Sequence, residues 1–165
     1  MRFRLGAAML VLSCASAIAQ PAATCEQAAF ASVVSEASTT LATMNEDNKK
    51  AFQAKLASLK VREGWSDGEY AAKATPFVKD ATTASLDEGN KSLLDKVPQL
   101  GGGANLEAGA ASGGDLAGKR CAMLEELRTL MAKLVENTKA KWAHMLAKVD
   151  AALEVSRQAK AAAGQ

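Results

Sequence analysis

The chain is poor in the side chains on which most catalytic and metal sites depend. It has one histidine, one tyrosine and three cysteines in 165 residues, and aromatic residues make up only 4% of it. One imidazole and isolated sulfurs cannot supply the four ligands of a tetrahedral metal site, so we expect no metal centre. The shortage of aromatic residues also predicts a thin core, because the abundant alanine buries little area.

The first 19 residues have the layout of a secretory signal. Arg2 and Arg4 precede an apolar run, which is followed by small residues ending in Ala17-Ile18-Ala19. This pattern predicts cleavage after Ala19 and a periplasmic or secreted protein. An alternative is also open, because Val11-Leu12-Ser13-Cys14 loosely resembles a bacterial lipobox, which would leave the protein lipid-anchored through Cys14.

Removal of residues 1–19 changes the charge balance. The full chain has 20 basic and 18 acidic residues, and the two arginines of the leader bring the mature chain to 18 of each. A net charge of zero gives no support for nucleic-acid binding. No segment after residue 20 has the length and apolar character of a membrane span.

Cys25 and Cys121 remain after either cleavage, and no other cysteine is left to pair with them, because a Cys14 at the N-terminus would carry the lipid. An even number of cysteines in an exported chain is typical of a disulfide formed in an oxidising compartment. We therefore expect these two residues to be bonded to each other.

The mature chain, 20–165, has a length that suits one domain, and its composition predicts an all-α fold. A first helix is expected from about Thr24 to Arg62 and a last one from about Leu116 to Ala162. Both carry apolar residues at the α-helical spacing, as a coiled coil or bundle would. The expected inner positions are Phe30, Val34, Ala37, Leu41, Met44, Asn48, Phe52, Leu56 and Leu59 in the first helix, and Leu124, Leu127, Met131, Leu134, Thr138, Trp142, Met145, Val149 and Leu153 in the last.

The middle of the chain predicts a kinked helix or two pieces. Ser66 and Glu69 have the spacing of a capping box, and a second cap is expected at residues 85–88. The helical pattern should end before Pro98, where a glycine-rich flexible loop, about 98–118, begins. Three helical segments joined in this way predict an elongated up-down-up bundle that places Cys25 and Cys121 at the same end.

The candidate chemical sites in the sequence are weak. Counting along the last helix turns His144 away from the apolar stripe, so we expect an exposed, inert histidine. Residues 113–119 match the start of a phosphate-binding loop, but Arg120 stands where a hydroxyl residue is needed and no strand precedes. We therefore expect no catalytic residues, no cofactor and no enzyme.

The function expected from these features is binding of another envelope or secreted protein, as a chaperone, adaptor or immunity-like protein would do, with homo-oligomerisation possible. A carrier of haem or a small apolar ligand is the alternative. Haem would be ligated by Met44 and His144, and the C-x-x-C-H motif for covalent attachment is absent.

Overall fold

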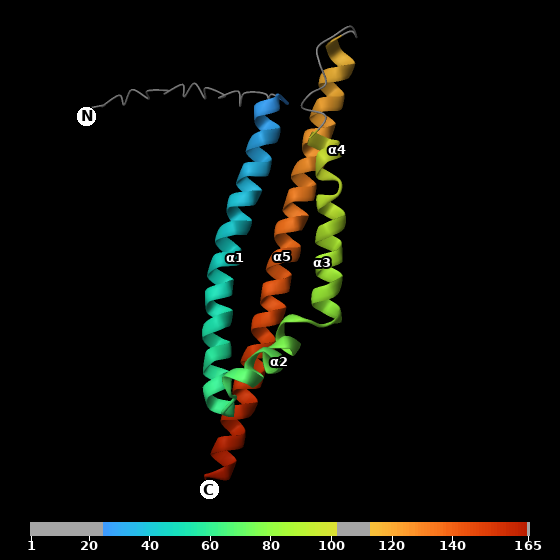
Figure 1. The fold of residues 1–165 in the computed structure, drawn as a ribbon. Helices are drawn as coiled ribbons and strands as arrows, with labels where there is room; N and C mark the ends of the chain where they lie inside the picture. Colours follow the sequence, from blue (N-terminus) through green and yellow to red (C-terminus); the bar gives the residue numbers. More distant parts are fainter. Residues whose placement is uncertain (1–24, 102–112, 165) are drawn as a thin grey trace, which may run out of the picture.

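A computed structural model describes residues 25–101 and 113–164, and every regular element in these ranges is an α-helix (Figure 1). The predicted signal peptide 1–19 and Cys14 lie outside the described residues, as does the middle of the predicted loop 98–118. The described flanks of that loop, 98–101 and 113–118, are helical. The helices are α1 (Gln27–Glu63), α2 (Asp67–Val78), α3 (Ala81–Leu94), α4 (Val97–Gly101) and α5 (Gly113–Ala163).

The longest helix, α5, is the element around which the others pack. It contacts α1, α2, α3 and α4, and in Figure 1 it lies between α1 and α3. At about 1.5 Å per residue, its 51 residues extend for roughly 75 Å, so both of its ends project beyond the 37 residues of α1. The middle of the chain forms the short helices α2, α3 and α4 instead of a third long one.

The core is divided into two apolar clusters along α5. One joins Phe30 and Ala37 of α1 to Leu124 and Leu127 of α5 and to Leu100 of α4. The other joins Phe52 and Leu56 of α1 to Met145 and Val149 of α5 and to Ala74 of α2. The burial of these residues confirms most of the inner positions predicted for the first and last helices.

Two positions depart from the predicted stripes. Val34 is 38% exposed, and its neighbour Val33 packs against the core in its place. Leu130 is 5% exposed although it lies outside the stripe predicted for the last helix. The reason is that α5 is covered on more than one side, so it buries a wider face than a helix with one neighbour.

A polar layer separates the two clusters. The indole nitrogen of Trp142 donates a hydrogen bond to the side-chain oxygen of Asn45 at 2.7 Å. On the opposite flank of α5, the amide nitrogen of Asn90 lies 3.4 Å from the hydroxyl of Thr138. Helix α1 runs unbroken through this layer, as the continuous phase of its stripe predicted.

The turn between α1 and α2 is built from local signals. Gly64 adopts φ 66°, in the left-handed region that favours glycine, and ends α1. Ser66 then caps α2: its hydroxyl accepts from the Glu69 N–H at 3.3 Å, and the Glu69 carboxylate accepts from the Ser66 N–H at 3.0 Å. This confirms the predicted capping box.

The prediction of a second cap at residues 85–88 is wrong. Helix α3 begins at Ala81, so Ser85 lies inside it, and the cap is a box formed by Asp80 and Thr83. Both segments have a short polar residue followed by a partner three positions later. The cap forms at the first of the two segments, Asp80 to Thr83, so α3 begins shortly after α2 ends.

Replacing Ser66 with alanine should lower the free energy of unfolding by about 1 kcal/mol, because the first turn of α2 would lose the acceptor for an otherwise unpaired N–H. Urea denaturation of Ser66→Ala beside Ser58→Ala measures this. Ser58 is the matched control, because its hydroxyl only donates to a carbonyl within α1. Equal stability of the two variants would contradict the cap.

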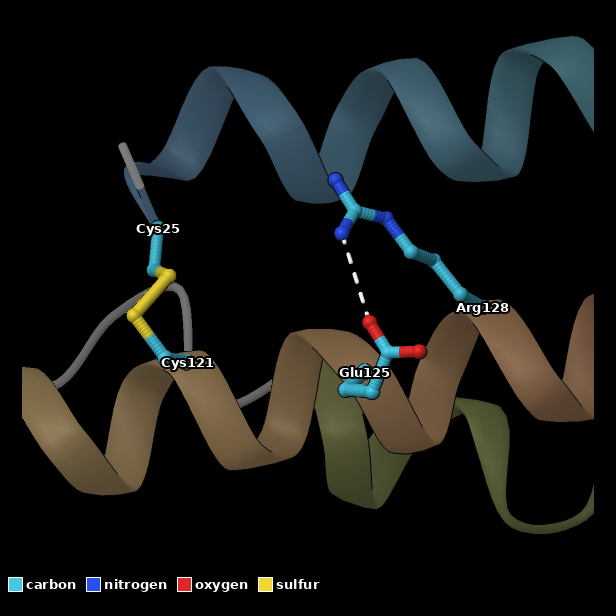
Figure 2. Close-up of a disulfide and its surroundings, with 4 residues drawn as sticks. All are labelled: Cys25, Cys121, Glu125 and Arg128. Carbon is cyan, nitrogen blue, oxygen red and sulfur yellow. Dashed lines mark hydrogen bonds and ion pairs between the residues drawn. A yellow bond between two sulfur atoms is a disulfide. The ribbon is translucent and has the colours of Figure 1, made fainter. Parts of the chain in front are cut away.

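Cys25 and Cys121 form a disulfide with a Cα–Cα distance of 5.0 Å, as the sequence predicted. Figure 2 shows that the bond connects Cys25, which lies two residues before α1, to Cys121 in the first part of α5. The two longest helices are therefore covalently joined near their first residues. Within residues 25–101 and 113–164, no helix combines the length and the apolar character that crossing a membrane requires.

Candidate functional site

The most highly connected group of charged side chains lies where α2 gives way to α3. The carboxylate of Asp80 accepts from the backbone N–H of Thr83 through Oδ1 at 2.8 Å, which caps α3. Its other oxygen, Oδ2, lies 2.7 Å from Nε2 of His144 and 2.5 Å from Nζ of Lys148. One carboxylate therefore connects the start of α3 to the middle of α5.

The spacing of the two α5 residues explains why they meet the same carboxylate. His144 and Lys148 are four positions apart, so they lie one turn apart on the same face of the helix. Lys148 also donates to the backbone carbonyl of Pro76 near the end of α2. All three side chains of this group, Asp80, His144 and Lys148, are about 30% exposed.

These contacts stabilise the charged form of Asp80. The ammonium of Lys148 is the largest cause of a pKa that lies well below the usual range of a carboxyl, followed by the Thr83 N–H and His144. A carboxyl with a lowered pKa stabilises the fold above its unfolded pKa, near pH 4. This stabilisation is lost as the pH falls below that value toward the folded pKa.

The structure corrects the expectation that His144 is exposed. The ring is about two-thirds buried and its Nε2 is hydrogen-bonded to Asp80. The physical reason is that the α2–α3 corner covers a side of α5 that lies away from the apolar stripe. A stripe indicates which face of a helix is most buried, but it does not show which other sides receive a neighbour.

Asp80 and His144 could be the acid and the base of a hydrolytic triad, which also needs a nucleophile. The surroundings of the pair indicate a structural role instead. The nearest hydroxyl in the group, on Thr83, is 2% exposed. It accepts from the Asp80 N–H and donates to the Asp80 carbonyl, each at 3.0 Å. A nucleophile must instead be hydrogen-bonded to the base and accessible to a substrate. The arrangement therefore fastens the α2–α3 corner to α5.

The segment Gly64-Trp65-Ser66-Asp67-Gly68 also has the G-x-S-x-G spacing of a hydrolase nucleophile elbow. An elbow of that kind joins a strand to a helix and exposes the serine. Here the segment joins two helices, and the Ser66 hydroxyl is hydrogen-bonded to Glu69 as part of the cap. In the described part of the chain, the hydrogen bond of His144 is to Asp80 and not to Ser66.

Replacing Asp80 with asparagine should lower the melting temperature at pH 7 by a few degrees, because Lys148 and His144 lose their carboxylate partner. The difference from the wild type should shrink as the pH falls below about 4, because the Asp80 carboxyl then takes up a proton in the unfolded chain while it is still charged in the folded one. Thermal melts of Asp80→Asn and of the control Asp47→Asn between pH 2.5 and 7 test this. A difference that does not change with pH would contradict the assignment.

The residues that resemble a phosphate-binding loop, 113–119, lie within the first turns of α5 and not in a loop. Among the described residues, no three His, Cys, Asp or Glu side chains converge as metal ligands would.

A groove between α1 and α5 is a second candidate site, and the sequence did not reveal it. It has a volume of about 420 Å³ and an apolar floor formed by both helices. Charged residues at its rim include Glu36 and Arg128, and Figure 2 shows Arg128 reaching from α5 toward α1 beside Glu125, 3.4 Å from its carboxylate. The groove residues are Val33, Glu36, Ala37, Thr40, Arg128, Met131, Ala132, Val135 and Glu136, and we call this surface the α1–α5 groove.

Comparisons with protein-family models, with curated proteins and with solved structures give no match to this chain. Its function can therefore be inferred only from its own contacts, charges and shape.

Proposed function

We propose that this chain is an exported, non-enzymatic protein that acts by binding another macromolecule of the cell envelope, as a chaperone, adaptor or immunity-like protein does. In this proposal the signal peptide 1–19 is removed and the mature chain is a single up-down-up helical bundle in the periplasm or outside the cell. The Cys25–Cys121 bond supports this location, because disulfides persist mainly in oxidising compartments.

The observation that carries the proposal is the α1–α5 groove. Its floor is apolar and accessible along two adjacent helices, and charged residues border it. A groove of this form suits an amphipathic helix, which places its apolar side chains in the floor and its polar ones at the rim. Small residues at Ala37 and Ala132 allow such a helix to approach closely.

The charges at the rim define the partner further. Glu36 and Glu136 border the groove together with one cation, Arg128. Arg128 lies within reach of Glu125 of its own helix, at 3.4 Å. We therefore propose a partner helix whose apolar face is flanked by more basic than acidic residues.

The test is site-specific photo-crosslinking in the native host. A photoreactive residue is placed at Thr40, which borders the groove, and in a control at Ala42, which is two positions further along α1 and faces away. The proposal expects one discrete adduct from position 40 and none from position 42. An adduct with the mass of two copies of the chain would identify homo-oligomerisation instead of a different partner.

A second variant shows whether the groove itself is the contact. Ala132 lies in the floor and is exposed, so Ala132→Glu should leave the fold intact while placing a charge where an apolar face must sit. The adduct at position 40 should then fall at least tenfold. An unchanged adduct, or the same adducts from positions 40 and 42, would contradict the proposal.

Haem carriage is not proposed. It would need His144, the only imidazole in the chain, and the Nε2 of that ring is hydrogen-bonded to Asp80. A haem absorbance band in protein purified from the periplasm, lost in His144→Ala, would overturn this choice.

A further inference from the structure

At one end of the molecule, α5 continues past the turn between α1 and α2 (Figure 1). An apolar hollow lies at this end. It has a volume of about 460 Å³ and is open to solvent on one side. We call it the basal hollow, and its residues are Leu59, Glu63, Trp65, Phe77, Ala151, Ala152, Val155, Ser156 and Ala159.

The walls of the basal hollow come from three separate segments. Leu59 of α1 is 2% exposed and closes the inside, while Val155 of α5 is 66% exposed at the edge. Trp65 is half-buried and follows Gly64, which has a left-handed backbone conformation. The backbone N–H of Trp65 donates a hydrogen bond to the backbone carbonyl of Lys60 at 3.0 Å. Phe77 of α2 adds a second aromatic ring. The hollow is thus a preformed apolar and aromatic surface.

Two polar side chains of the basal hollow have no hydrogen-bond or ionic partner among the residues that the structure describes. Ser156 is 5% exposed, and its hydroxyl makes no hydrogen bond. The carboxylate of Glu63 is exposed and forms no ion pair or hydrogen bond within the described residues. A buried hydroxyl without a partner is unfavourable, so a ligand that hydrogen-bonds to it gains affinity.

Three cations near the basal hollow have partners other than Glu63. Lys60 pairs with Asp67, and Arg157 pairs with Glu154 at 2.7 Å. Arg62 points toward the Leu153 carbonyl, with its Nη1 3.4 Å from that oxygen. Within the described residues Glu63 is thus left without an ion pair, and its carboxylate lines the hollow together with the two aromatic side chains, Trp65 and Phe77.

We propose that the basal hollow binds a small amphiphilic cation, an alkyl or aryl body that carries an ammonium group. The apolar walls take the body, and the faces of Trp65 and Phe77 attract the positive charge. Glu63 supplies the opposite charge, and the N–H donors of an ammonium can also reach the Ser156 hydroxyl once that side chain rotates. The inference does not depend on the α1–α5 groove or on its partner.

The test compares three probes of equal chain length, decylammonium, decanol and decanoate, by titration calorimetry on the full mature, disulfide-bonded chain. Decylammonium should bind about three- to fivefold more tightly than decanol, the upper part of the range expected of one solvent-accessible ion pair. Decanoate should bind most weakly, because Glu63 repels it. Equal affinity for the three probes, or no binding of decylammonium, would overturn the proposal.

Two pairs of variants locate the site. Glu63→Gln should remove the preference for decylammonium over decanol, whereas Glu36→Gln, in the α1–α5 groove, should leave it unchanged. Ala152→Leu fills the hollow and should weaken decylammonium binding at least tenfold, whereas Ala147→Leu, at an exposed position of α5, should not. Circular dichroism verifies the fold of each variant. Retained preference in Glu63→Gln, or retained binding in a folded Ala152→Leu, would refute the site.

Discussion

Removing the disulfide by the double substitution Cys25→Ser and Cys121→Ser should lower the free energy of unfolding by about 4 to 5 kcal/mol. The two cysteines are 96 residues apart, and a bond that closes so long a loop removes much of the freedom of the unfolded chain. The effect should be large relative to the total, because a domain of this size is stabilised by only about 5 to 15 kcal/mol.

Urea denaturation of the oxidised wild type and of the double-serine variant measures this loss. The wild type treated with reductant is the control, and it should unfold together with the double-serine variant, since both lack only the bond. Cys121 is exposed, so serine there should leave the packing of α5 unchanged. A loss below about 1 kcal/mol would show that the bond constrains the unfolded chain little.

Replacing Leu127 with alanine should lower the free energy of unfolding by about 3 to 5 kcal/mol, the upper part of the range for buried leucines. Leu127 is 0% exposed and lies in the cluster that joins α1 and α4 to α5. Large side chains of the same cluster, among them Phe30 and Leu124, surround it, and in a close-packed interior they cannot move far enough to fill the space that the removed methyl groups leave.

The matched control is Leu94→Ala in α3, where the leucine is 51% exposed. Leu94→Ala should lower the free energy of unfolding by less than about 1 kcal/mol, because little apolar area is lost from the interior. Both variants are measured by urea denaturation with the disulfide intact. Similar losses in the two variants would mean that α5 is not packed against α1 and α4 as described.

Much of the fold could be predicted because its signals are local. The apolar spacing of α1 and α5, the box at Ser66 and Glu69, and the cysteine pair each depend on residues whose partners are close in sequence or unique in the chain. Cys25 has only Cys121 as a partner once the leader is removed, so the pairing needed no knowledge of the packing.

The candidate sites could not be predicted because they depend on which sides of α5 are covered. His144 lies off the apolar stripe, and only the position of the α2–α3 corner brings Asp80 to it. The sequence offers two similar capping patterns, at Asp80 and at Ser85, and only the structure shows that Asp80 is the cap. Asp80 is also the residue that connects α3 to α5. Likewise, the α1–α5 groove and the basal hollow are the surfaces that the short helices leave open.

The most direct test of the account is the intact mass of the protein after export by its native host, followed by non-reducing peptide mapping. We expect a single chain that begins at Gln20, is lighter than its reduced form by two hydrogen atoms, and gives one linked peptide pair that contains Cys25 and Cys121. A chain that retains residues 1–19, an acylated chain that begins at Cys14, or free thiols at Cys25 and Cys121 would contradict an exported, disulfide-joined helical protein.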